Sequence, residues 1–84
     1  IEVETPSMLR NAIESGARRF LLDNMSPEQI KECVKLKKVG MFYEVSGGIG
    51  EKNFSDYLIP GVDAISIGGL THSVESTDIS MEID

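Results

Sequence analysis

The sequence MFYEVSGG, residues 41–48, decides the class of fold. Its first part, Met41–Val45, is a short apolar and aromatic run of the kind that forms a buried strand. The run ends in a serine and two glycines, which are typical of a tight turn out of a strand. Helical patterns lie on both sides of this stretch. The sequence therefore predicts a strand between two helices, the repeating unit of a parallel sheet.

The same alternation continues in both directions along the chain. Three further strands are predicted upstream and downstream: Ile1–Glu4, Phe20–Leu22 and Val62–Ile67. The residues at which successive strands end, Asp23, Ser46 and Gly68, recur at nearly equal intervals. Regular βα units with right-handed crossovers are typical of α/β barrels. We therefore predict an α/β fold with parallel strands, too few to close a barrel, and a last strand at Ile79–Ile83 that packs elsewhere.

Three helices are expected between these strands. The segments Thr5–Pro6 and Ser26–Gln29 each place a hydroxyl at the N-cap and proline at the first helical position, and Ser26–Gln29 completes a capping box. The second helix is expected to end at Gly40. The third is expected to follow the glycine turn, with Phe54, Tyr57 and Leu58 on one side, and to stop at Pro60–Gly61. Cys33 falls on the apolar stripe of the second helix and is predicted to be core. Lys35, Lys37 and Lys38 are predicted to form its solvated face.

Composition limits the classes of function. The 84 residues allow one small domain at most. A net charge of −6 argues against a nucleic-acid partner, and no apolar run has the length of a membrane span. A single cysteine cannot form an internal disulfide, so a cytoplasmic location is the default expectation. An anionic small molecule remains a candidate ligand, because backbone N–H groups bind phosphate without basic side chains.

The candidate site residues follow the strands, where α/β barrels carry their active sites. Glu4 and Asp23 each end a strand, and two neighbouring carboxylates suit Mg²⁺ or the hydroxyls of a ribose. The alternative is that both are simply solvated residues at strand ends. Sequence alone leaves the two interpretations open.

Two glycine-rich turns suggest a phosphate site. Ser46, Gly47 and Gly48 follow one strand, and Gly68 and Gly69 follow the next. Barrels often bind phosphate with the loops after two consecutive late strands, and a helix start after the first turn would add partial positive charge. An ordinary tight turn is the alternative for either one alone.

The single histidine follows the second turn. At His72, it is a candidate donor to the same phosphate, although a lone histidine is more often a surface or cap residue.

Taken together, the ordered motifs resemble quinolinate phosphoribosyltransferase, and the resemblance runs nearly end to end. The segments that carry it are Glu2–Glu4, Leu22–Asn24, Glu44–Ile49, Gly61–Asp63, Gly69–Ser73 and Asp78–Ser80. The resemblance implies that residues 1–84 are the C-terminal part of an incomplete TIM-like barrel in a larger two-domain enzyme, a homo-oligomer. It implies a reaction in NAD biosynthesis: quinolinate and phosphoribosyl pyrophosphate give nicotinate mononucleotide, pyrophosphate and CO₂ with Mg²⁺.

Roles for single residues follow from the resemblance. Glu4 and Asp23 match the carboxylates that hold the ribose hydroxyls and Mg²⁺. Two loops match the phosphate-binding turns, with His72 as an added donor; their residues are Ser46, Gly47, Gly48, Ile67, Gly68 and Gly69. The basic residues that grip the quinolinate carboxylates lie upstream in the family, so we expect the isolated 84-residue chain to be inactive.

Three alternatives stay open on sequence alone. Nicotinate phosphoribosyltransferase shares this barrel, so nicotinate is a second candidate acceptor. Another phosphate-binding barrel enzyme would need a lysine or second acid in the barrel mouth, and no lysine ends a strand here. A non-catalytic fragment that docks on a partner chain is the third.

Overall fold

The structure, a computed structural model, describes residues 1–74. It is an α/β fold with one sheet in the strand order β1-β2-β3-β4-β5. Strands β1 to β4 run parallel, and β5 runs antiparallel to β4. The elements are β1 (Glu2–Val3), α1 (Pro6–Glu14), β2 (Arg19–Asp23), α2 (Pro27–Lys35), β3 (Phe42–Ser46), the 3₁₀ helix η1 (Phe54–Tyr57), β4 (Ala64–Ile67) and β5 (Leu70–Ser73).

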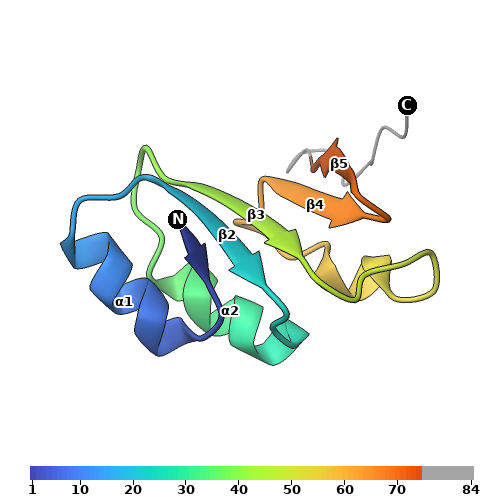
Figure 1. Ribbon diagram of the computed structural model, residues 1–84, viewed down its shortest axis with the longest axis horizontal. Helices are drawn as coiled ribbons and strands as arrows, with labels where there is room; N and C mark the ends of the chain where they lie inside the picture. The colour runs from blue at the N-terminus through green and yellow to red at the C-terminus, as the bar shows by residue number, and fades with distance from the viewer. Residues whose placement is uncertain (75–84) are drawn as a thin grey trace.

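Both α-helices lie on the same side of the sheet (Figure 1). The core lies between the helices and the sheet. Side chains alternate along each strand, so Phe20 and Leu22 of β2 face the helices together with Tyr43 and Val45 of β3. All four are almost completely buried. The rings of Phe20 and Tyr43 meet edge to face with centroids 5.7 Å apart. The parallel pairing of β1 to β4 confirms the predicted strand direction. The core contains Cys33, as expected.

The opposite side of the sheet is called the open face here, and β2 and β3 supply most of it. Three register pairs define it: Arg19 with Phe42, Leu21 with Glu44, and Asp23 with Ser46. The Arg19 guanidinium lies 4.4 Å from the centre of the Phe42 ring. Among residues 1–74, no helix covers this face (Figure 1). The described strands form one open sheet, so the barrel remains a prediction.

The starts of both α-helices are as predicted, and the end of the second is not. Met8 N–H donates to the Thr5 hydroxyl, and Ser26 and Gln29 form the full capping box. However, α2 ends at Lys35, because the next N–H, that of Leu36, already bonds three residues back to the Cys33 carbonyl. Gly40 instead lies in a separate turn just before β3.

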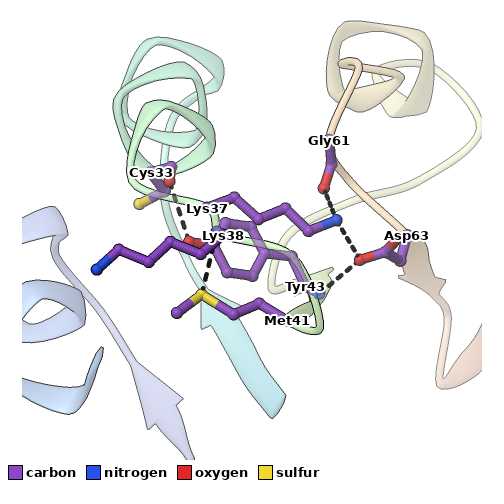
Figure 2. Close-up of polar contacts among 7 residues, drawn as sticks. All are labelled: Cys33, Lys37, Lys38, Met41, Tyr43, Gly61 and Asp63. Carbon is purple, nitrogen blue, oxygen red and sulfur yellow. Dashed lines mark hydrogen bonds and ion pairs between the residues drawn. The ribbon is translucent and has the colours of Figure 1, made fainter. Parts of the chain in front are cut away.

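The prediction that Lys35, Lys37 and Lys38 form a solvated face is wrong for Lys37. Lys37 lies across the amino ends of the strands, with Nζ 2.7 Å from Asp63 Oδ2 and 2.8 Å from the Gly61 carbonyl oxygen (Figure 2). The same Asp63 oxygen accepts the backbone N–H of Tyr43 at 2.8 Å. An ion pair therefore ties the end of α2 to β3 and to the start of β4.

The third predicted helix is much shorter than expected. The chain forms only the four-residue η1, because Asn53 first closes a loop before it. Asn53 Oδ1 accepts the N–H of Gly50 at 2.7 Å, and its Nδ2 donates to the Gly48 carbonyl at 3.0 Å. These side-chain bonds compete with the helical backbone pattern over residues 48–53.

Strand β5 (Leu70–Ser73) is not in the sequence-based prediction, which assigns no structure to this segment. Gly68 and Gly69 both have positive φ, 57° and 85°, and form the two-residue turn of a β4–β5 hairpin. Such turns match the right-handed twist of the flanking strands and favour glycine. The predicted strand Ile79–Ile83 lies outside the described residues. Within residues 1–74, neither helix is long and apolar enough to cross a membrane.

Candidate functional site

The carboxyl ends of β1 to β4 gather most of the predicted site residues at one edge of the sheet. Asp23 ends β2 and pairs in register with Ser46, which ends β3. Val3 ends β1 and pairs with Leu22, and Glu4 follows in a bend at the same edge. Ile67 ends β4 at the same edge, because Val45 pairs with Ile65.

Asp23 and Ser46 are in direct contact at this edge. The Ser46 hydroxyl donates to Asp23 Oδ1 at 3.0 Å, and the Asn24 N–H donates to the Ser46 carbonyl at 2.9 Å. Both side chains are half-buried. The carboxylate is therefore held against the first residue of the glycine turn.

The turn after β3 interlocks with the turn after β2. Gly47 has φ of 90°, and a Cβ built on it would lie 2.7 Å from the Asn24 nitrogen and 2.8 Å from Asp23 Oδ1. Asn24 itself has a φ of 58°, a conformation that asparagine tolerates better than most side chains. Only glycine fits at position 47, because any side chain would displace the Asp23 carboxylate or the backbone beside it.

The glycine turns leave backbone donors open. Within residues 1–74, the N–H groups of Gly47 and Gly48 donate to no protein acceptor. Consecutive residues of positive φ, such as these, can make concave anion-binding sites from their N–H groups. The prediction that a helix start adds partial positive charge after this turn is wrong, because η1 is short and begins only at Phe54. Any anion binding here would depend on the N–H groups alone.

The second turn, Gly68–Gly69, is exposed at the tip of the β4–β5 hairpin. The structure thus puts both glycine turns beyond the carboxyl ends of neighbouring strands.

His72 is not brought to Asp23. It pairs with Ile65 across the hairpin and is 5% exposed, so it lies on the face that carries the core. Its neighbour Thr71 lies on the open face, where its hydroxyl donates to Glu44 Oε2 at 3.4 Å. A role for His72 as a phosphate donor therefore stays a prediction.

Two carboxylates, Glu4 and Asp23, are the candidates for a metal. In the described part of the chain, no group of three or more histidine, cysteine and acidic side chains is arranged to hold a metal ion. Mg²⁺ commonly takes one or two carboxylates and completes its shell with water and substrate phosphate. A two-carboxylate edge fits that donor set.

A hollow of about 180 Å³ lies on the open face rather than at this edge. It is lined by Arg19, Leu21, Phe42 and Glu44 with their neighbours Ile1 and Phe20. These positions precede Asp23 and Ser46 along the strands, toward the amino ends. The hollow therefore belongs to the uncovered face of the sheet.

Sequence reasoning missed Asn53, which shapes the loop after β3 through its side-chain bonds. An asparagine just before a helical pattern is a turn signal that was available. The bond from Ser46 to Asp23 depends on strand register and had no local signal.

Comparison with known proteins gives one consistent family. Residues 1–82 match the family model described as "Quinolinate phosphoribosyl transferase, C-terminal domain". The chain is 45% identical to a probable nicotinate-nucleotide pyrophosphorylase (carboxylating) of Methanocaldococcus jannaschii, over 99% of this chain and 32% of that protein. It is 41% identical to the protein of that name from Bacillus subtilis, covering 29% of it. It is 34% identical to the human nicotinate-nucleotide pyrophosphorylase (carboxylating), covering 30%.

The chain thus spans about a third of the length of these curated relatives. The family match covers nearly the whole chain. This protein belongs to the quinolinate phosphoribosyltransferase family, and residues 1–82 match the model of its C-terminal domain.

Proposed function

We propose that this chain supplies the ribose- and phosphate-binding edge of an enzyme that transfers a phosphoribosyl group to quinolinate. The products are nicotinate mononucleotide, pyrophosphate and CO₂, a step of NAD biosynthesis. The observation that carries the proposal is the contact of Asp23 with the glycine turn at Ser46 and Gly47, on the edge that Glu4 shares. The activity for which the relatives are named supports the choice of reaction.

Glu4 and Asp23 have the role of orienting the ribose in this proposal. Carboxylate oxygens accept hydrogen bonds from the two ribose hydroxyls and favour positive charge that develops at the anomeric carbon. Mg²⁺ would be held by the same two carboxylates and would neutralise charge on the pyrophosphate leaving group. The half-buried site of Asp23 strengthens its electrostatic effect relative to open water.

Phosphate is bound by the two glycine turns in this proposal. Gly47 and Gly48 offer open N–H groups, and Ile67, Gly68 and Gly69 form the neighbouring turn. Binding through the backbone also accounts for a phosphate site in a chain of net charge −6.

In this proposal the acceptor is held by residues outside this chain, as the resemblance to the family implies. Quinolinate is a dianion, and Arg19 and Lys37 lie at the amino ends of the strands, away from the carboxyl edge. We therefore propose that the 84 residues are the last part of a barrel domain in a larger homo-oligomeric enzyme, and that the isolated chain is inactive. An assay of pyrophosphate release tests this, and turnover by the 84-residue chain alone would refute it.

The test of the function uses the full-length protein. Pyrophosphate release should require quinolinate, phosphoribosyl pyrophosphate and Mg²⁺ together. Asp23→Asn should lower kcat/KM by at least about 100-fold, because the charge that faces the sugar is lost. Asp56→Asn is the matched control, since Asp56 is exposed on η1.

Two results would contradict the proposal. Asp23→Asn with normal turnover would remove the carboxylate from the mechanism. Turnover with nicotinate in place of quinolinate, and none with quinolinate, would assign the alternative acceptor.

A further inference from the structure

The hydroxyl of Ser46 is engaged by Asp23 and is therefore a poor candidate for a direct phosphate ligand. Its Oγ donates to Asp23 Oδ1 at 3.0 Å, across the join between β2 and β3. Gly47 packs against the same oxygen, because a Cβ at Gly47 would lie only 2.8 Å from it. Asp23 Oδ1 is thus held from two sides by the residues that end β3.

The second oxygen of Asp23 is in a different position. Within residues 1–74, the hydrogen bonds of this carboxylate involve Oδ1 alone, which leaves Oδ2 for a ligand. A carboxylate with one fixed oxygen has lost most of its rotational freedom before a ligand arrives. Preorganised groups stabilise a transition state more than groups that must be ordered during the reaction.

We infer that Ser46 is a positioning residue: its hydroxyl orients the Asp23 carboxylate so that Oδ2 faces the ribose and its metal ion. The inference rests on the proposed function and deepens it. It divides the turn between two tasks. The backbone N–H groups of Gly47 and Gly48 bind phosphate, and the Ser46 side chain acts through Asp23.

The kinetic test compares Ser46→Ala, Ser46→Thr and wild type in the full-length protein. Ser46→Ala should lower kcat and kcat/KM for phosphoribosyl pyrophosphate together, by about 10-fold to 100-fold, as for a misplaced catalytic group. The Kd for inorganic phosphate should stay unchanged. Ser46→Thr keeps the hydroxyl and should recover most of the activity. Ser55→Ala, on exposed η1, controls for a serine lost elsewhere.

A second test does not depend on turnover. Urea unfolding of Ser46→Ala, Asp23→Ala and the double variant gives the coupling between the two side chains. The effect of Ser46→Ala on unfolding should be smaller when Asp23 is already absent. A wild-type protein that shows no turnover would contradict the proposed function. The unfolding measurements would still decide whether Ser46 acts on Asp23.

Two outcomes would overturn the inference. Additive effects of the two single variants would show that Ser46 does not act through Asp23. A Ser46→Ala variant with weakened binding of inorganic phosphate and unchanged kcat would make the hydroxyl a direct phosphate ligand.

Discussion

At the scale of single residues, glycine at position 47 decides how closely the two turns approach each other. Gly47 and Gly48 both have positive φ, 90° and 68°. They differ in their surroundings, because a Cβ at Gly47 would meet Asp23 and Asn24, whereas a Cβ at Gly48 would meet no atom within 4 Å. The two positions therefore separate the cost of backbone conformation from the cost of a steric clash.

Gly48→Ala should lower the free energy of unfolding by about 1 kcal/mol, the cost of a left-handed alanine. Gly47→Ala has the same conformational cost and also displaces Asp23, so it should lower the free energy of unfolding by more, about 3 kcal/mol in all. Urea unfolding of the two variants measures the difference. Equal losses would mean that the contact between Gly47 and Asp23 does not constrain the fold.

Tyr43 gives a second prediction at this scale, on alkaline pH. Burial, with Cys33 nearby, raises the pKa of Tyr43 from 10.0 to about 12, and burial, with Glu32 nearby, raises the pKa of Cys33 from 9.0 to about 11. Because both folded pKa values lie above the unfolded ones, the unfolded chain loses these protons first. Stability from these groups is therefore complete below pH 9.0 and is lost as pH rises toward about 12.

Tyr43→Phe removes one of the two groups, so its unfolding free energy should fall less steeply at alkaline pH than that of wild type. At neutral pH the variant should lose about 1 kcal/mol, because the Tyr43 hydroxyl donates to the buried Cys33 carbonyl at 3.1 Å. Tyr57→Phe removes a similar bond, to the Met25 carbonyl, and is the control for that neutral-pH loss. Parallel alkaline curves for wild type and Tyr43→Phe would contradict the account.

At the scale of elements, Asp63 joins three segments at the amino ends of the strands. It accepts from Lys37 beyond α2 and from the backbone of Tyr43 in β3, and its own N–H bonds to the Tyr43 carbonyl (Figure 2). The α2–β3 connection and the start of β4 therefore share one carboxylate. Its place at the amino ends, opposite to the candidate site, indicates a role in stability.

Asp63→Ala should destabilise the protein by about 2 kcal/mol, because the Tyr43 backbone N–H loses its acceptor and the Lys37 ammonium keeps only the Gly61 carbonyl. Lys37→Met should cost less, about 1 kcal/mol, since Asp63 keeps its bond to Tyr43 and the pair is partly exposed. Thermal unfolding measures both, with Asp56→Ala as the exposed control. A larger loss for Lys37→Met than for Asp63→Ala would contradict this order.

Local signals predicted some elements and missed others for physical reasons. The starts of α1 and α2 were predictable because caps act within one turn of the chain. The place of Lys37 was not predictable, because its partner Asp63 lies 26 residues away in sequence and no local pattern reveals the pair. Strand β5 was missed although Gly68–Gly69 between apolar residues is a hairpin signal, because the two glycines were interpreted as a turn after a parallel strand.

The candidate site was partly predictable on the same grounds. Parallel strands place their ends at one edge, so Asp23, Ser46 and Gly47 were expected together, and the structure brings them into contact. The placement of His72 depends on the hairpin, which turns it toward the core.

At the scale of the whole molecule, the main feature is the open face of the sheet, which no helix among residues 1–74 covers. It carries Phe42 and Leu21 together with Arg19 and Glu44, and β1 offers an unpaired strand edge beside it. Uncovered edges and apolar faces promote association. The 84-residue chain alone should therefore associate, with an apparent mass in size-exclusion chromatography that rises with concentration. A monomer at all concentrations would show that this face needs no cover.

The account as a whole depends on one edge of the sheet binding a phosphoribosyl group. A crystal structure of the full-length protein with phosphoribosyl pyrophosphate and Mg²⁺ tests this most directly. We predict the ribose hydroxyls beside Glu4 and Asp23, with a phosphate on the backbone of Gly47 and Gly48. A sugar phosphate bound on the open face near Arg19, or anywhere away from Asp23, would contradict it.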